Sequence, residues 1–341
     1  MIRSIAPLRF GLAGGGTDVS PYSDLHGGAI LNSTINMFAR SSIEPLNNGK
    51  IILESLDHNE VLEFSESNCL PINGKLDLLK GVYNRICQDY NDNQPLSLRL
   101  STYVDAPPGS GLGSSSTLTV SIIGAFCEWL NLPLGEYDIA KLAYDIERID
   151  LGQAGGKQDQ YAATFGGFNF MEFYADDKVI VNPLRIKEKY INELEHDLIL
   201  YYTQTSRLSS TIIEEQTKNV RGKNEVSINA MHKLKNQAKS MKEALLMGEV
   251  DKIGPILDYG WQQKKNMADG ITNPEIDFIY KRALENGATG GKISGAGGGG
   301  FMLCFAPKNY KYKVIKALQE LGGDVVSFQF ENKGLRTWKI S

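Results

Sequence analysis

At the centre of the chain lies Pro107-Pro108-Gly109-Ser110-Gly111-Leu112-Gly113-Ser114-Ser115-Ser116, followed by an apolar run from Leu118 to Leu130. Its three glycines allow backbone conformations and close approaches that a Cβ atom would prevent. Serine is a common N-cap residue, so Ser114 to Ser116 predict the start of a helix. The free N–H groups and the dipole at a helix start attract anions. The segment therefore predicts a phosphate-binding loop.

The apolar run behind this loop favours that prediction over a serine-capped surface turn. Large apolar residues cover the predicted helix on almost all sides: Val120, Ile122, Ile123, Phe126 and Trp129. A helix that is apolar all round is buried in a protein core. Its N-terminus then directs the loop toward the interior of the molecule.

The composition is that of a globular protein of about two domains. The 341 residues are 42% hydrophobic and 22% charged, with a net charge of −4. No long basic run occurs, so neither nucleic acid nor an anionic membrane is an expected partner. No apolar run is long enough to span a bilayer, and the N-terminus lacks a secretory apolar region. The four cysteines and four histidines show no metal-type spacing, and we expect a cytoplasmic protein without a structural metal.

Hydrophobic patterns predict an α+β fold with a domain boundary near residue 190. Pro7 divides two short predicted strands, Ile2 to Ala6 and Leu8 to Leu12, at the start of the first domain. After residue 190 the order strand–helix–strand–strand–helix–strand predicts a split βαβ, ferredoxin-like layer. We expect one domain over residues 1–190 and a second over residues 191–341.

A carboxylate stands in the apolar stripe of a helix predicted over Glu136 to Asp150. Ala140, Ala143 and Glu147 lie at positions i, i+3 and i+7, on one face of that helix. A buried carboxylate needs a partner, which is an arginine or a metal ion. Glu147 is therefore a candidate functional residue.

The common nucleotide-binding motifs are excluded, one by its structural context and the others because their residues are absent. Gly295, Gly297 and Gly300 match Gly-x-Gly-x-x-Gly, but Phe301 to Phe305 predict a strand where the dinucleotide motif requires a helix. The loop at residues 107–116 lacks the Gly-Lys-Ser/Thr of a Walker A motif, and the protein-kinase signatures are absent. A phosphoryl-transfer enzyme with this sequence uses another scaffold.

The parts that phosphoryl transfer requires are nevertheless present. A backbone cradle, a magnesium ligand, a residue that orients the attacking oxygen and a cation are needed. The loop at residues 109–116 and Glu147 with a loop serine supply the first two. Asp159 supplies the third, and Arg9 or Lys157 the fourth.

Three glycine-rich segments resemble, in order and spacing, the motifs of the GHMP small-molecule kinases. They are Pro7 to Asp18, Pro107 to Ser116 and Lys292 to Gly300, and the resemblance covers essentially the whole chain. It implies a mixed α/β N-terminal domain, a ferredoxin-like C-terminal domain, and ATP and Mg²⁺ as cofactors.

The resemblance also implies roles for single residues. Asp159 matches the aspartate that takes the proton of the attacking hydroxyl. Arg9 matches an arginine that can hold this aspartate and stabilise developing charge. Ser115 and Glu147 match the magnesium ligands. The nucleotide loop would comprise Pro108, Gly109, Ser110, Gly111, Leu112, Gly113, Ser114, Ser115 and Ser116.

The first motif departs from that of galactokinases, which have Gly-Glu-His-Thr-Asp where this chain has Gly14-Gly15-Gly16-Thr17-Asp18. Galactose is therefore not the expected substrate, and the missing side chains leave room for a bulkier one. This motif and Gly155 to Gln160 most resemble the family branch that acts on D-glycero-D-manno-heptose 7-phosphate. The resemblance implies phosphorylation of the anomeric hydroxyl to the 1,7-bisphosphate, a precursor of heptose in bacterial surface polysaccharides.

The expected substrate contacts follow from the resemblance and from the charge of a sugar phosphate. The motifs imply Gly15, Gly16, Thr17, Asp18, Gly297 and Gly298. A second phosphate needs charge-assisted contacts, for which Lys157 and Arg207 are candidates. Both could equally be solvated basic side chains.

Two alternative functions remain open: another sugar 1-kinase of the family, such as a fucokinase, and a non-catalytic sugar sensor on the same fold. A sensor could lose its catalytic residues, whereas Arg9, Ser115, Glu147 and Asp159 are all present. The oligomeric state, the exact sugar and its anomer stay open.

Overall fold

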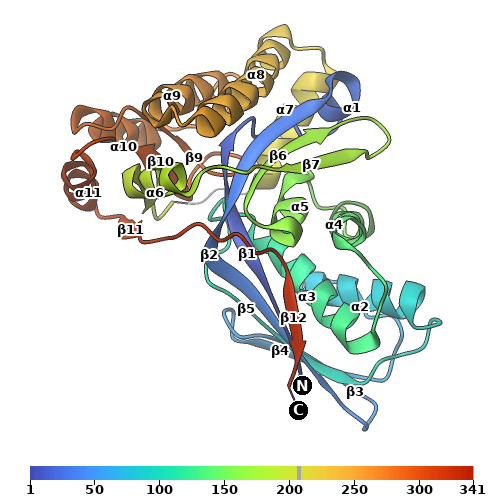
Figure 1. Cartoon of the computed structure of the whole chain (residues 1–341). Coiled ribbons are helices and arrows are strands. Elements are labelled where there is room, and N and C mark those ends of the chain that lie inside the picture. The colour runs from blue at the N-terminus through green and yellow to red at the C-terminus, as the bar shows by residue number, and fades with distance from the viewer. Residues whose placement is uncertain (206–208, 341) are drawn as a thin grey trace.

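The computed structural model describes residues 1–205 and 209–340, which form two β-sheets with helices packed on them (Figure 1). The larger sheet has the strand order β12-β1-β2-β5-β3-β4, with β6 paired to β2 and β7 paired to β6. Its pairs are antiparallel except for the parallel pair of β3 and β5. The strands are β1 (Ile2–Ala13), β2 (Gly28–Pro45), β3 (Lys50–Ser55), β4 (Glu60–Ser65), β5 (Leu98–Val104), β6 (Phe168–Phe173), β7 (Val179–Pro183) and β12 (Arg336–Lys339).

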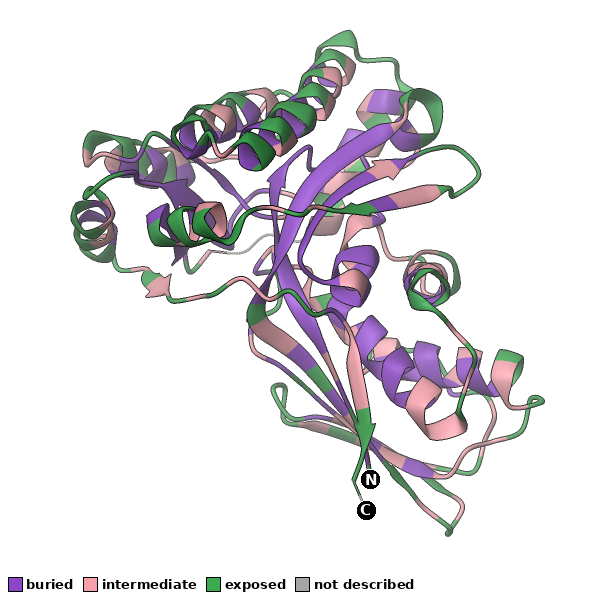
Figure 2. Ribbon diagram, in the orientation of Figure 1, coloured by how far each residue is buried: buried purple, intermediate pink, exposed green. Residues whose placement is uncertain are grey.

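Strands β1 and β2 form a long ribbon that links the two halves of the molecule (Figure 1). The first part of β2 pairs with β6, and its last part pairs with β5. The end of β1 (residues 6–13) and the start of β2 (residues 28–35) are continuously buried (Figure 2). Residues near the start of β2 and the end of β1 therefore hold fixed positions beside the functional loops.

Helices cover one face of the larger sheet. They are α2 (Asp77–Tyr90), α3 (Ser114–Leu130), α4 (Glu136–Asp145), the π-helix η1 (Ile146–Asp150) and α5 (Gln158–Phe165), while the short α1 (Tyr22–His26) precedes β2. The predicted burial of the apolar helix is confirmed, because Val120, Ile122, Ile123 and Phe126 of α3 are fully buried in one core cluster with residues of α2 and of the sheet.

The smaller sheet confirms the predicted ferredoxin-like layer. Its antiparallel strand order is β11-β8-β10-β9, which is the order of a split βαβ motif. Its strands are β8 (Leu198–Tyr202), β9 (Gly290–Ile293), β10 (Phe301–Phe305) and β11 (Asp324–Val326). Its helices are α6 (Glu188–Asp197), α7 (Ser209–Arg221), α8 (Glu225–Met247), the 3₁₀ turn η2 (Val250–Lys252), α9 (Ile253–Lys264), α10 (Pro274–Glu285) and α11 (Lys311–Gln319).

The two sheets share part of their hydrophobic core. One cluster contains Phe10 and Leu31 from the larger sheet together with Leu200 and Phe301 from the smaller one. The chain also returns at its end to the larger sheet, where β12 pairs with β1. The domain boundary near residue 190 stays a prediction. The last strand, β12, follows that boundary in the sequence but belongs to the larger sheet, which is otherwise formed by residues before it.

One expectation about local structure is wrong. Pro7 does not split the first strand, because β1 runs through it and a shift in register between Pro7 and Arg9 accommodates the missing N–H. The helix expected over residues 136–150 is present, and its geometry changes at Ile146 from α to π. None of the described helices combines the length and apolar character needed to cross a bilayer.

The C-terminal segment is fixed by close contact with the junction of α5 and β6. Gly166 has φ +68°, and a Cβ there would lie 2.2 Å from the backbone nitrogen of Gly334. Gly74 also has a positive φ, +90°, but a Cβ there would contact nothing within 4 Å. Substitution of Gly74 by alanine therefore strains only the backbone, whereas the same substitution at Gly166 also creates a steric clash.

We predict that Gly166→Ala lowers the free energy of unfolding by roughly 3 kcal/mol or more, through backbone strain and forced separation of the two segments. Gly74→Ala should cost only about 1–2 kcal/mol, the strain of the left-handed conformation alone. Urea unfolding measures both variants. Equal losses would show that the contact at Gly334 contributes nothing.

Candidate active site

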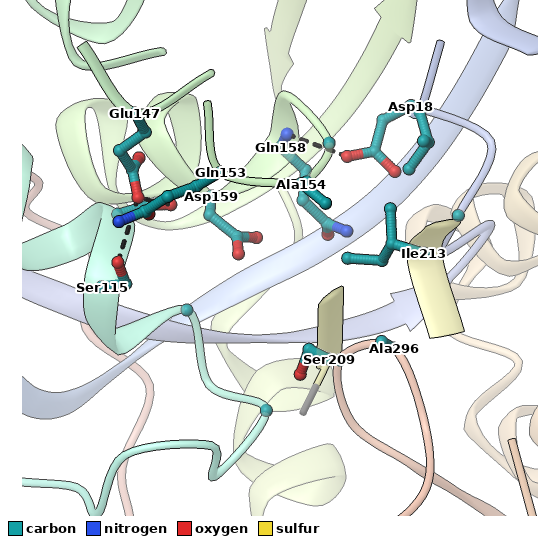
Figure 3. Close-up of a pocket in the computed structure, with 18 of the residues that line it drawn as sticks. Asp18, Ser115, Glu147, Gln153, Ala154, Gln158, Asp159, Ser209, Ile213 and Ala296 are labelled. Atoms are coloured by element: carbon teal, nitrogen blue, oxygen red, sulfur yellow. Dashed lines mark hydrogen bonds between the residues drawn. The ribbon is translucent and has the colours of Figure 1, made fainter. Parts of the chain in front are cut away.

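A cavity of about 230 Å³ lies where the predicted functional segments meet (Figure 3). Its wall includes the loop before α3, the π-helix, residues 153–156 and the first turn of α5. Residues of the first motif, of the third glycine segment, of α7 and of α9 complete it. Glu147 and Asp159 both line this cavity together with the serine-rich turn, so distant parts of the sequence form one site.

The loop at residues 109–116 has an open helix start, although its serines do not cap the helix as predicted. The N-cap of α3 is Gly113, with φ 76° in the left-handed region, and no side chain caps the helix. The hydroxyls of Ser115 and Ser116 instead donate to Glu147 Oε1, each at 3.1 Å. The first turn of α3 therefore presents its backbone to the cavity without competition from a capping side chain.

Six residues of the predicted nucleotide loop line the cavity: Gly109, Gly111, Gly113, Ser114, Ser115 and Ser116. The other three do not. The side chains of Ser110 and Leu112 are buried in the protein, and Pro108 is exposed to solvent.

The third glycine segment braces this loop from behind. Ser294 Oγ donates to the carbonyl of Gly111 at 2.9 Å, and the N–H of Phe301 donates to the carbonyl of Ser110 at 2.9 Å. A Cβ at Gly111 would lie 2.4 Å from the carbonyl oxygen of Ser294. Gly295 and Ala296 line the cavity.

Gly297 and Gly298, predicted to contact substrate, are not among the residues that line the cavity. The N–H of Gly298 donates to the carbonyl of Ile271 at 2.8 Å, and a Cβ at Gly297 would lie 2.8 Å from that same oxygen. Their contacts therefore hold the third glycine segment against residue 271.

Arg9 joins the loop to Asp159. Its side chain is buried, its Nε lies 2.7 Å from Asp159 Oδ1, and its Nη1 donates to the carbonyl of Gly111 at 2.7 Å. Asp159 lies in the first turn of α5, and its carboxylate is 3.2 Å from the point where a Cβ of Gly113 would be. The carboxylate therefore lies directly beside the start of α3.

Glu147 is fully buried, as its place in the apolar stripe predicted. Besides the two serine hydroxyls on Oε1, its Oε2 accepts from Gln160 Nε2 at 2.6 Å, and Arg148 Nη1 lies 3.8 Å from Oε1. The π-helix places the consecutive residues Glu147 and Arg148 on the same cavity. Hydroxyl and amide donors thus stabilise a carboxylate that the core alone would not accept.

Asp18 offers a buried acceptor to the cavity. Its Oδ2 accepts from the backbone N–H groups of Lys157 and Gln158, at 2.9 and 3.1 Å, while its Oδ1 has no partner among the described residues. Burial, and next the charge of Asp159, raises the pKa of this carboxyl. Gly156 is required here, because a Cβ would lie 1.9 Å from Oδ2.

The other predicted residues of the first motif differ in position. Gly16 lines the cavity, whereas Gly15 and Thr17 are not among its lining residues. The hydroxyl of Thr17 donates to the carbonyls of Gly14 and Ala29, at 2.8 and 3.0 Å. Thr17 therefore shapes the loop that carries Asp18.

Lys157, one of the two predicted phosphate contacts, is not brought to the cavity. Lys157 is buried, but its ammonium group lies 2.7 Å from Asp177 Oδ1 and 5.6 Å from the ring centre of Tyr144, and it does not line the cavity. This geometry does not favour the predicted contact with a sugar phosphate. Arg207, the second candidate, lies outside the described residues.

Two cations that were not predicted from the sequence also line the cavity, Arg148 and Lys264. Lys264 is buried at the end of α9 and donates to the carbonyl of Gly295. Burial lowers the pKa of its ammonium group to about 8, and the charge of Arg9 contributes. Leu257, Trp261 and Lys264 lie at i, i+4 and i+7, so the signal that identified Glu147 was present here as well.

Comparisons with known proteins agree with this geometry. The family models "GHMP kinases N terminal domain" and "GHMP kinases C terminal" match residues 77–167 and 241–324. The D-glycero-alpha-D-manno-heptose 7-phosphate kinase of Campylobacter jejuni is 51% identical over 339 residues, with 99% of both chains covered.

Two further relatives extend the comparison. A crystal structure of a D-glycero-D-manno-heptose 1-phosphate kinase from Bacteroides thetaiotaomicron has a TM-score of 0.85 and 46% identity, with 100% of both chains covered. The bifunctional fucokinase/GDP-fucose pyrophosphorylase of Arabidopsis thaliana is 28% identical over 322 residues, which are 91% of this chain and 30% of that protein. Family models thus match both halves of the sequence, and the C. jejuni relative is 51% identical over 99% of the chain. The chain therefore belongs to the GHMP kinase family.

Proposed function

We propose that this protein is an ATP-dependent sugar kinase that phosphorylates the anomeric hydroxyl of D-glycero-D-manno-heptose 7-phosphate and yields the 1,7-bisphosphate. The observation that carries the proposal is the convergence of the Arg9–Asp159 pair and the loop before α3 on one cavity. The choice of sugar is supported by the relative from C. jejuni, which matches essentially the whole chain.

Asp159 is the residue that we propose as the base. Arg9 holds its Oδ1, so Oδ2 is the oxygen suited to accept the proton of the anomeric hydroxyl. As that proton leaves, the sugar oxygen bonds to the γ-phosphorus of ATP and the bond to the ADP oxygen breaks. The guanidinium of Arg9, beside the carboxylate, also stabilises the negative charge that develops there.

The loop and the first turn of α3 would hold the phosphates of ATP. The glycines at 109, 111 and 113 line the cavity without side chains, and the helix start supplies N–H groups and a positive dipole end. The backbone contact with Ser294 keeps this loop from moving away from the cavity.

Glu147 and Ser115 suit a magnesium ion. Both are hard oxygen ligands, they lie 3.1 Å apart, and both line the cavity. Among the described residues no group of three or more His, Cys, Asp or Glu could hold a metal. One carboxylate and one hydroxyl fit Mg²⁺, which usually takes its other ligands from phosphate and water. Bound there, the ion would neutralise charge on the phosphates.

Asp18 would hold the sugar. Its unpartnered Oδ1 can accept a hydrogen bond from a sugar hydroxyl. Gly16 lines the cavity near Asp18 without a side chain of its own, and a Cβ there would lie 2.6 Å from Met267 Cε. We place the reaction in the cytoplasm, where ATP is available, and its product upstream of surface polysaccharide synthesis.

A fucokinase is the second candidate, because the A. thaliana relative shares 28% identity over 91% of this chain. The two named heptose kinases also differ in the phosphate position that their names give. Substrate preference therefore decides between these possibilities.

We predict that Asp159→Asn lowers kcat by on the order of 10²–10⁴, the usual effect of losing a positioned base, while ATP and sugar still bind. Coupled measurement of ADP release and calorimetric titration test the two statements. Asp150→Asn, which removes a partly exposed carboxylate paired with Arg85, is the matched control and should retain full activity. Full activity of Asp159→Asn would remove this residue from the mechanism.

We predict that Glu147→Gln raises the Mg²⁺ concentration for half-maximal rate by at least roughly tenfold, because a neutral amide binds the ion less tightly than a carboxylate. Titrating Mg²⁺ at saturating ATP and sugar measures this shift. Variants with the same Mg²⁺ dependence as the unaltered protein would show that the ion binds elsewhere.

We predict that a panel of acceptors gives the highest kcat/KM for D-glycero-D-manno-heptose 7-phosphate. The panel includes the heptose without phosphate, heptose 1-phosphate, L-fucose and galactose, and ADP release is measured for each. Preference for L-fucose would establish the second candidate. No ADP release with any acceptor would favour a sugar sensor.

A further inference from the structure

Two lysines are buried beside the cavity without an acidic partner. Lys264 on α9 and Lys292 on β9 are 3% and 5% exposed. Lys264 Nζ donates to the carbonyl of Gly295, and Lys292 Nζ donates to the carbonyl of Gly11 at 2.9 Å. Among the described residues, neither ammonium group forms an ion pair within 4 Å.

The two ammonium groups converge on one point. A Cβ at Gly15 would lie 3.8 Å from Lys292 Nζ and 3.9 Å from Lys264 Nζ. Gly15 has no side chain to fill this position, and its neighbour Gly16 lines the cavity, as does Lys264. Two cations from the smaller sheet layer therefore meet next to the first motif of the larger one.

The electrostatics of this pair are unfavourable without an anion. Burial lowers the pKa of Lys292 well below its usual value, and the charges of Lys264 and Arg9 lower it further. For Lys264, burial and Arg9 lower the pKa, and only Asp18 opposes them. Removing like charges from water is costly unless an opposite charge compensates them.

We propose that Lys264 and Lys292 form the subsite for the distal phosphate of the sugar substrate. This inference rests on the proposed function and names the residues that select a phosphorylated acceptor. A phosphate monoester carries up to two negative charges and three acceptor oxygens, which suits two ammonium groups that each have protons left to donate. The anomeric end at Asp159 and the phosphate end at Lys264 then lie on the wall of the same cavity.

A groove that adjoins the cavity is the other place with cations, and the structure favours it less. It is lined by Arg148, Lys218 and Arg221 among others. Lys218 and Arg221 are exposed, so water screens them, and Lys218 lies 4.0 Å from Glu215. Arg148 lies near Glu147. Lys264 and Lys292 are buried and have no acidic partner within 4 Å among the described residues. They therefore need a bound anion more than the exposed cations of the groove do.

The test compares two acceptors, D-glycero-D-manno-heptose 7-phosphate and the same heptose without phosphate. The preference, defined as the ratio of their kcat/KM values, should fall roughly 10- to 100-fold in Lys264→Met, the loss expected for one charge-assisted hydrogen bond. Lys264→Gln, which keeps an amide donor for the carbonyl of Gly295 but no charge, should lose the preference as well. Lys292→Met provides an independent third variant.

Two control variants should keep the preference. Lys265→Met removes the neighbouring lysine, whose ammonium group pairs with Asp277 at 2.7 Å. Arg221→Ala removes a cation from the adjoining groove. Circular dichroism confirms that every variant is folded.

Binding without nucleotide gives a second readout. Calorimetric titration with heptose 7-phosphate should show affinity that falls as pH rises through about 8, because Lys264 then loses its proton. Arg9, Asp18 and Lys292 face this ammonium group, and the loss of its charge in Lys264→Gln raises the pKa of Lys292. The double variant Lys264→Gln with Lys292→Met removes both titrating groups and should lose the decline in affinity near pH 8. Persistence of the decline would assign it to another group and contradict the proposal.

The kinetic outcomes separate the subsite from the proposed function. No turnover of any sugar phosphate by the unaltered protein would contradict the function itself. Turnover without preference for the phosphorylated heptose would leave the kinase in place and overturn the subsite. A preference that survives in Lys264→Met, Lys264→Gln and Lys292→Met, or disappears in Arg221→Ala, would overturn it too. Rescue by Lys264→Gln would show that Lys264 only fixes the carbonyl of Gly295.

Discussion

Direct backbone contact between two glycine segments holds the site together. A Cβ at Gly111 would lie 2.4 Å from the carbonyl oxygen of Ser294, and a Cβ at Gly295 would lie 2.7 Å from the Cα of Gly111. Such approaches require residues without side chains. One segment precedes the buried helix α3 and the other joins β9 to β10 (Figure 1). This contact therefore fixes the smaller sheet against the glycine-rich loop at residues 109–116.

Around this contact the protein buries several charged side chains. Arg9, Asp18, Glu147, Lys264 and Lys292 are all nearly inaccessible to water. Some are compensated within the chain, as Arg9 is by Asp159 and Glu147 is by two hydroxyls and an amide. Others keep unused hydrogen-bonding capacity, such as Asp18 Oδ1. Buried polar groups of this kind are costly to the free protein, which is the physical reason for proposing that a ligand binds here.

The sequence predicted those features that depend on local pattern. The buried helix, the carboxylate at Glu147 and the ferredoxin-like order of elements all follow from periodicity, and the structure confirms them. The nearness of Arg9 to Asp159, 150 residues apart, was implied only by resemblance to a family. Lys264 carried a periodic signal that was overlooked.

Features set by tertiary contact escaped prediction. The direction of Lys157 is determined by Asp177, which lies in the turn between β6 and β7 and has no pattern that links it to residue 157. Likewise the serines of α3 turn toward Glu147 instead of capping their helix, because that carboxylate approaches from another element. Pro7 remains inside a strand because a shift in register absorbs its missing donor.

The account depends on one cavity that holds the nucleotide phosphates and the sugar together. A crystal structure with heptose 7-phosphate and a non-hydrolysable ATP analogue tests this most directly. It should place the terminal phosphates at the first turn of α3 and the anomeric oxygen within hydrogen-bonding distance of Asp159. A sugar bound with its anomeric carbon remote from Asp159 would contradict the account.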